Sequence, residues 1–141
     1  MSEPVDPEPG PLSAGFIALA FLGGVAGTAA RYGLGRWLPT GSGFPWGTFT
    51  ANLLGSFILG ALLQQLSRRG ADTGGRHRIR LLVGTGFCGG LTTYSTYAVE
   101  TDLLFRDHRA GLALVYLLAT VWAGLIVVAA GIAASDRVLR P

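Results

Sequence analysis

Hydrophobic residues dominate four long stretches of the chain that contain no Asp, Glu, Lys or Arg. These stretches are residues 12–30, 37–67, 81–99 and 110–135. A helix needs about 20 predominantly apolar residues to cross the hydrocarbon core of a bilayer, and each stretch has about that length or more. The pattern therefore predicts an all-α integral membrane protein with four spans, over about residues 12–37, 46–67, 79–103 and 110–134.

The middle of the third stretch is unsuited to a continuous helix. Two adjacent glycines are followed by four hydroxyl residues, which are Thr92, Thr93, Ser95 and Thr96. Glycine weakens a helix, and a freed backbone group is costly in hydrocarbon unless it finds a polar partner. We therefore expect the third helix to be broken at mid-membrane and to face protein or a polar cavity, which is typical of an ion or substrate site.

The four spans leave no room for a second domain. Residues 1–11 hold four prolines among three acidic residues and predict a disordered tail. Residues 12–135 form one transmembrane domain, and residues 136–141 a short C-terminal tail. An even number of spans predicts that both termini lie on one side of the membrane.

Charge is concentrated in the connections between the spans. The net charge of +3 comes from 11 basic residues, all of them arginine. One side of the membrane would carry seven arginines and the other four, which gives a weak preference for termini inside. The excess of arginine in the connections thus reflects the orientation of the spans in a cell membrane, and it does not indicate a nucleic-acid partner. A single cysteine, Cys88, excludes an internal disulfide.

Polar residues inside the spans recur at helical spacing. Thr48, Asn52 and Ser56 form a stripe on the second span, and Tyr116 and Thr120 form a thinner one on the fourth. A carboxamide at membrane depth needs a partner, so Asn52 either joins helices or serves a permeating polar species.

Other positions also have two interpretations. Tyr94, Tyr97 and Glu100 share one face of the third span, either as core packing and a polar helix end or as part of a site. Arg31 either anchors the first span at the interface or lies in a polar vestibule. Gly23 and Gly27 have the spacing of close helix packing. Four short helices enclose little volume, so a pathway would need grooves completed by a second subunit, which implies a homodimer.

Three segments carry a resemblance to a known family. They are residues 23–32 (GGVAGTAARY), 47–57 (GTFTANLLGSF) and 86–97 (GFCGGLTTYSTY). In this order they resemble the signatures of the bacterial fluoride channels, the CrcB/Fluc family, over about residues 15 to 133. The resemblance implies a fluoride-specific ion channel and no enzyme. Passive fluoride efflux from the cytoplasm would give the cell fluoride resistance.

The same resemblance implies an antiparallel, dual-topology dimer with two fluoride pores and a structural sodium ion at its centre. The carbonyls of Gly89 and Thr92 from each subunit would bind the sodium. The partner is either an identical subunit or a sibling of opposite orientation.

The resemblance also implies a set of pore residues. These are Arg31, Thr48, Asn52, Tyr94, Tyr97, Glu100, Tyr116 and Thr120. The clearest departure is the pair Tyr94 and Tyr97, where the family has phenylalanines whose positive ring edges face the anion. Whether these tyrosines act through ring edges or hydroxyls stays open.

Two other functions fit four short spans. A small proton-coupled multidrug transporter would need a mid-membrane carboxylate, whereas Glu100 lies near the end of its span. A non-transporting membrane assembly protein would give no reason for a broken third helix.

Overall fold

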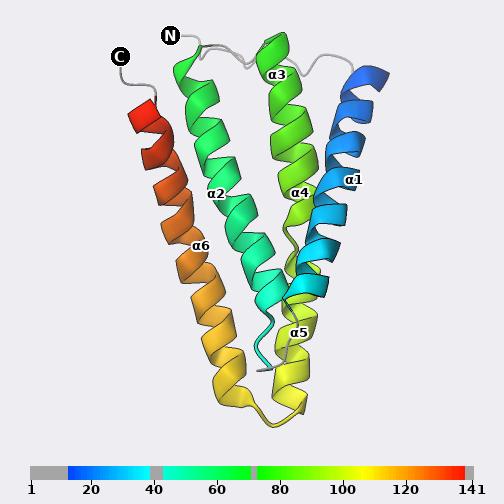
Figure 1. Ribbon diagram of the computed structural model, residues 1–141, viewed down its shortest axis with the longest axis vertical. Helices are drawn as coiled ribbons and strands as arrows, with labels where there is room; N and C mark the ends of the chain where they lie inside the picture. The colour runs from blue at the N-terminus through cyan, green and yellow to red at the C-terminus, as the bar shows by residue number, and fades with distance from the viewer. Residues whose placement is uncertain (1–12, 39–42, 71–72, 139–141) are drawn as a thin grey trace, which may run out of the picture.

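The computed structural model describes residues 13–38, 43–70 and 73–138 of the chain of 141 residues. The tail expected over residues 1–11 lies outside the described residues. Within them the chain forms four helical rods, and the third rod is bent (Figure 1). This agrees with the predicted all-α fold with four helical segments.

Three rods are uninterrupted helices. Helix α1 (Ala14–Trp37) begins after Ser13, whose hydroxyl accepts a hydrogen bond of 3.3 Å from the Phe16 amide. Helix α2 (Trp46–Arg68) follows Pro45, and α6 (Ala110–Val138) continues past the predicted end near residue 134. Among the described residues, these are the helices long and apolar enough to cross a membrane.

The third rod is assembled from several pieces. It comprises α3 (Gly75–Ile79), the π-helical segment η1 (Arg80–Cys88), α4 (Gly89–Leu91) and α5 (Tyr94–Arg106). Its helix starts before the predicted position 79, immediately after Gly74, whose φ of 58° suits glycine. Between α4 and α5 the backbone of Thr92 and Thr93 is extended. The predicted break is therefore present, just after the two glycines.

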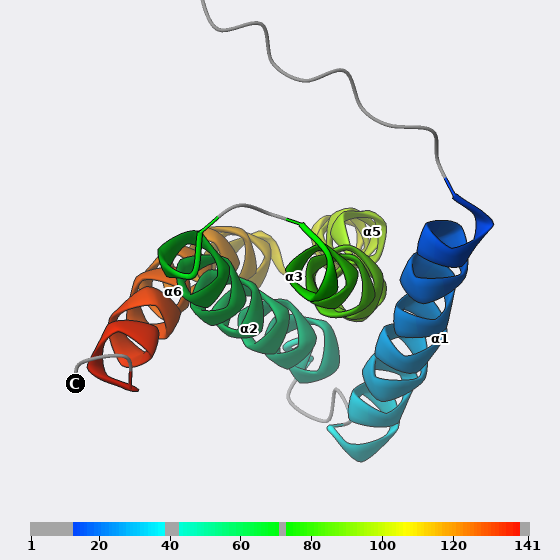
Figure 2. The same cartoon turned by 90° about the horizontal axis from the view of Figure 1, so that it is seen from above.

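The rods alternate in direction. Figure 1 shows the start of α1 and the end of α6 at the same end of the bundle, as an even number of spans requires. Seen from above, α6, α2, the third rod and α1 follow one another in an open arc (Figure 2). The arc places α2 between α6 and the third rod, so polar residues on α2 can meet both neighbours.

Glycines bring α1 and the third rod into backbone contact. A Cβ atom added at Gly23 would lie 3.0 Å from the Cα of Gly86, and one at Gly90 would lie 3.1 Å from the Cα of Gly24. An added Cβ at Gly27 would lie 2.8 Å from the amide nitrogen of Leu91. The spacing of Gly23 and Gly27 thus gives the close helix packing that the sequence predicted.

Helices α2 and α6 pack closely along their length, and polar contacts tie their ends together. A Cβ atom added at Gly60 would lie 2.7 Å from the carbonyl oxygen of Val128. At the helix ends, Asp136 accepts a hydrogen bond of 2.7 Å from Gln64 and pairs with Arg68 at 3.0 Å. These contacts fix the register of the two helices, which decides which polar residues meet between them.

The molecule buries few large side chains and exposes many. Tyr116 is fully buried, and Tyr97, Leu104 and Ala113 join it in a small cluster. Large apolar side chains are exposed on α1 and along α6. Water would disfavour so much exposed apolar surface, whereas lipid accommodates it. The chain is a multi-pass membrane protein.

Candidate functional site: a polar cavity at the helix break

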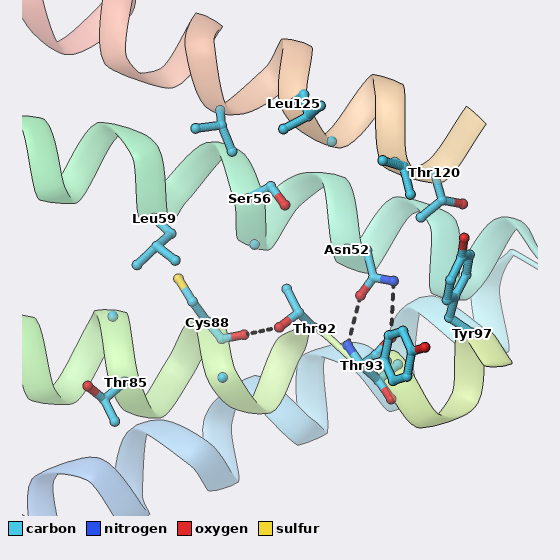
Figure 3. Close-up of a pocket in the computed structure, with 17 residues that line it drawn as sticks. Asn52, Ser56, Leu59, Thr85, Cys88, Thr92, Thr93, Tyr97, Thr120 and Leu125 are labelled. Atoms are coloured by element: carbon cyan, nitrogen blue, oxygen red, sulfur yellow. Dashed lines mark hydrogen bonds between the residues drawn. The ribbon is translucent and has the colours of Figure 1, made fainter. Parts of the chain in front are cut away.

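A cavity of about 640 Å³ lies between α2, the broken third rod and α6 (Figure 3). The described residues that line it include no charged side chain. Its polar lining residues are Asn52, Ser56, Thr85, Thr92, Thr93, Tyr94, Tyr97 and Thr120. Asn52 and Ser56 from one predicted stripe, Thr120 from the other, and the predicted break therefore border the same space.

Asn52 bonds both polar backbone groups of Thr93. Its Oδ1 accepts a hydrogen bond of 2.8 Å from the Thr93 amide, and its Nδ2 donates one of 3.2 Å to the Thr93 carbonyl. The helix-joining interpretation of Asn52 is therefore present in the fold. A carboxamide has two N–H hydrogens, so one remains to donate to another acceptor.

Thr93 also starts the helix that follows the break. Its hydroxyl oxygen accepts a hydrogen bond of 3.2 Å from the Thr96 amide, as an N-cap residue does. Before the break, the Thr92 amide and the Thr92 hydroxyl both donate to the Cys88 carbonyl at 2.9 Å. The hydroxyl residues after the two glycines thus satisfy backbone groups on both sides of the break.

These bonds redirect two amides away from the carbonyls of Gly89 and Thr92. In a continuing helix, the Thr93 amide would bond the Gly89 carbonyl and the Thr96 amide would bond the Thr92 carbonyl. Here the first amide donates to Asn52 and the second to the Thr93 hydroxyl. Both carbonyl oxygens have lost their usual helical partners and can bind something else. Neutral hard oxygens of this kind fit a sodium ion.

The two tyrosines of the predicted pair have different surroundings. Tyr97 is 9% exposed, and its hydroxyl donates a hydrogen bond of 3.0 Å to the Leu117 carbonyl on α6. Tyr94 is 81% exposed, although it also borders the cavity, and the two ring centroids lie 6.1 Å apart. Thr120 donates to the Tyr116 carbonyl on its own helix at 2.7 Å. Its hydroxyl oxygen can still accept, but its hydrogen is engaged.

A second polar group surrounds Glu100. One carboxylate oxygen accepts a hydrogen bond of 2.8 Å from the Thr48 hydroxyl, and the other accepts one of 2.7 Å from the Tyr116 hydroxyl. Three of the predicted site residues, from α2, α5 and α6, are therefore in direct contact. The ring of Tyr116 also meets that of Tyr97 edge-on, with centroids 5.2 Å apart, which connects this group to the first cavity.

Arg31 lies in another cavity, of about 330 Å³, which is bordered by Thr48, Thr96 and Glu100. The Nε of Arg31 is buried and has no hydrogen-bond partner among the described residues. A buried donor without a partner is costly. Arg31 also borders the cavity, so an acceptor there would have the other N–H groups of its guanidinium as partners. This placement favours the vestibule interpretation of Arg31 over the interface anchor.

Comparison with known proteins shows the family of this chain. The family model described as CrcB-like protein, Camphor Resistance (CrcB), matches residues 18–132. The chain belongs to the CrcB family. Its relatives carry names that state a function, as three examples show.

The fluoride-specific ion channel FluC 2 of Leifsonia xyli is 44% identical over 117 residues, which cover 83% of this chain and 81% of that protein. The fluoride-specific ion channel FluC of Phenylobacterium zucineum is 41% identical over 126 residues, which cover 86% of this chain and 96% of that protein. The FluC of Thermus thermophilus is 42% identical over 110 residues, with 77% and 84% covered. The family that the three motifs indicated is thus confirmed.

Thr93 is the residue of this CrcB protein that the site prediction missed. Its backbone binds Asn52 and its hydroxyl caps α5. A sequence signal was available, because threonine is a preferred N-cap residue and here it precedes a helical face. The pairing with Asn52 had no such signal, since the two residues are 41 positions apart.

Proposed function

We propose that this CrcB protein is a fluoride-specific ion channel that lets fluoride leave the cytoplasm passively and so confers fluoride resistance. The observation that carries the proposal is the agreement between its relatives and its geometry. Proteins named fluoride-specific ion channels match most of the chain, and most of the polar residues implied by that likeness border two cavities.

Fluoride is small and strongly hydrated, so a pore has to replace its water with hydrogen-bond donors while still allowing exit. The free Nδ2 hydrogen of Asn52 supplies such a donor in the first cavity, and the Arg31 guanidinium supplies others in the second. Thr48 lies one helical turn from Asn52 and borders the second cavity, so a fluoride ion would pass from one group of donors to the other.

Glu100 places a condition on an anion pathway at this position. Its carboxylate is an anionic acceptor, and the hydroxyls of Thr48 and Tyr116 already point at it. A hydroxyl has one hydrogen to donate, so fluoride can take either hydroxyl only when the carboxylate turns away or binds a proton. Glu100 would therefore compete with fluoride for these two donors.

A two-fold dimer with a central sodium ion is the assembly that the freed carbonyls support. The Gly89 and Thr92 carbonyls of two subunits would supply four neutral oxygens, which suit a small monovalent cation without a carboxylate. The sodium would contribute a positive charge that favours anions nearby. We propose an antiparallel, dual-topology arrangement in the plasma membrane, made with an identical subunit or with a sibling of opposite orientation.

The two alternative functions have less support. A proton-coupled transporter needs a mid-membrane carboxylate that exchanges protons for its substrate, whereas Glu100 lies near the end of its span. A scaffold needs neither the break nor a buried Arg31 Nε that has no hydrogen-bond partner among the described residues. Membership in a family with named channels favours conduction over both.

Purified protein in liposomes tests the proposal directly. With fluoride inside and a potassium ionophore to balance charge, we expect rapid fluoride efflux without ATP, measured with a fluoride electrode. Chloride efflux from matched liposomes should stay at the level of protein-free vesicles. Equal fluxes of the two anions through the purified protein would contradict fluoride specificity.

The tyrosine pair gives a second test. The Tyr97 hydroxyl is used on Leu117, so we expect its ring edge to face the anion. Tyr97→Phe should keep fluoride flux within about threefold and cost about 1 kcal/mol of stability for the lost hydrogen bond. Tyr97→Ala should reduce flux at least tenfold. If Tyr97→Phe alone abolishes flux while the protein stays folded, the hydroxyl is the donor and the ring-edge mechanism is wrong.

The same pair of substitutions at Tyr94 serves as the matched comparison. Tyr94 borders the same cavity but is largely exposed, so a partner subunit or lipid must cover it. We expect Tyr94→Phe to conduct normally. Full activity of both the Tyr94→Ala and Tyr97→Ala proteins would remove the pair from the pathway.

A further inference from the structure

The two hydrogen bonds between Asn52 and Thr93 have a consequence for the cation site. We propose that Asn52 holds the break in the third helix open and thereby controls sodium binding as well as the anion pathway. The inference rests on the proposed function, because it assigns a positioning role to a residue of that same site.

The geometry of Thr93 makes this pairing specific. Its backbone is extended, with φ −151° and ψ 127°, and in an extended residue the N–H and C=O point to the same side. One planar carboxamide can therefore pair with both groups, as a facing strand residue would. Asn52 pairs in this way, accepting at 2.8 Å and donating at 3.2 Å. A leucine of similar size at position 52 could do neither.

The pairing decides where the Thr93 amide points. The Thr93 amide is partly buried within a membrane span, where hydrocarbon offers no acceptor, so without Asn52 it needs another one. The Gly89 carbonyl is the one that a continuing helix would supply. The backbone of Gly89–Leu91 is already helical. Extending α4 by a turn therefore needs new backbone dihedral angles mainly at Thr92 and Thr93. The extension would use the Gly89 carbonyl internally and take a ligand from the sodium.

Thr93 contributes to the same outcome through its side chain. Its hydroxyl holds the Thr96 amide, which would otherwise be able to bond the Thr92 carbonyl. Asn52 thus keeps the Thr93 amide from the Gly89 carbonyl, and the Thr93 hydroxyl keeps the Thr96 amide from the Thr92 carbonyl. The remaining Nδ2 hydrogen of Asn52 is still available to an anion. A single side chain would therefore donate to the anion directly and act on the cation site through Thr93.

The test measures assembly against sodium concentration, with no transport readout. Protein prepared in sodium-free buffer is titrated with sodium chloride at constant ionic strength, and the dimer fraction is followed by chemical cross-linking in detergent. In Asn52→Leu we expect the sodium concentration at half-assembly to rise at least tenfold over that of the unsubstituted protein. In Thr93→Ala, which leaves the Asn52 pairing intact, we expect a smaller rise.

Thr48→Val is the matched control. It removes a polar side chain one turn from Asn52 on the same face of α2, but the Thr48 hydroxyl bonds Glu100 and not the break. Its fluoride flux should fall while its sodium midpoint stays unchanged.

The possible outcomes distinguish the positioning role of Asn52 from the proposed sodium site and the proposed fluoride conduction. One outcome is that assembly of the unsubstituted protein depends on sodium while the sodium concentration at half-assembly is the same in Asn52→Leu and Thr93→Ala as in that protein. That result would overturn the positioning role and leave the cation site standing. If Asn52→Leu does not fold, Asn52→Ala, which removes the same two hydrogen bonds with a smaller side chain, decides in the same way. A parent protein whose assembly ignores sodium would overturn the cation site and this inference together, while fluoride conduction would still be judged by the liposome flux.

Discussion

Asn52→Asp is expected to reduce fluoride flux by roughly a thousandfold without unfolding the protein. Aspartate has nearly the shape of asparagine, and its carboxylate can still accept the hydrogen bond from the Thr93 amide. It replaces the donating N–H₂ by negative charge. Two unit charges about 4 Å apart repel by about 4 kcal/mol at an effective dielectric constant of about 20, which corresponds to about three powers of ten in rate.

The measurement is fluoride efflux from liposomes at about pH 8, well above the usual pKa of aspartate. Gln65→Glu is the matched control, because it adds the same charge to α2 at a residue outside the lining of the cavity. It should conduct at nearly the original rate. Normal flux in Asn52→Asp would leave Asn52 as a joint between helices and remove it from the anion pathway.

Gly89→Val is expected to weaken dimerisation while leaving the protomer folded. Gly89 is exposed and has helical dihedral angles, and a Cβ atom added there meets nothing within 4 Å in the protomer. Valine therefore creates no conflict inside one chain. In a two-fold dimer joined at the break, two valines would crowd the same interface. Overpacking by about 1 kcal/mol for each would raise the dimer dissociation constant roughly thirtyfold or more.

Dimer dissociation in detergent, together with helix content by circular dichroism, checks this expectation. Gly111→Val is the matched control, since a Cβ atom at Gly111 also meets nothing within 4 Å and this position lies at the start of α6, away from the break. It should dimerise normally. A Gly89→Val protein that dimerises and conducts like the parent would place the interface elsewhere.

The sequence alone determined the parts of this protein that depend on neighbouring residues. The length of each apolar stretch set the helices, and the glycines and threonines of the third stretch set the break near Thr92. Gly23 and Gly27 at a spacing of four residues predicted a close helix contact for α1, and the structure shows that its partner is the third rod. Each of these signals lies within a short segment of the chain, since a helix turn needs only about 3.6 residues and a span about 20.

The boundaries of the third rod were less predictable. Its apolar pattern starts after the arginines of the connecting loop, yet the helix already begins at Gly75 and includes Arg76 and Arg78. Arginine is a good helix former, and its side chain can reach water from a helix end. The apolar pattern marks only the part of the helix that lies in lipid, so it cannot show how far the helix extends into the aqueous phase.

Only the tertiary structure decided which polar groups meet. The sequence left Asn52 either joining helices or serving a permeating species, and the fold places it on the backbone of Thr93 with one N–H hydrogen to spare. It also places Glu100 against hydroxyls from α2 and α6. It separates Tyr97, which is buried, from Tyr94, which is exposed, although the two share a helical face. The physical reason is helix register: a shift of one turn, about 5.4 Å, would leave every stripe in the sequence intact and break every one of these bonds.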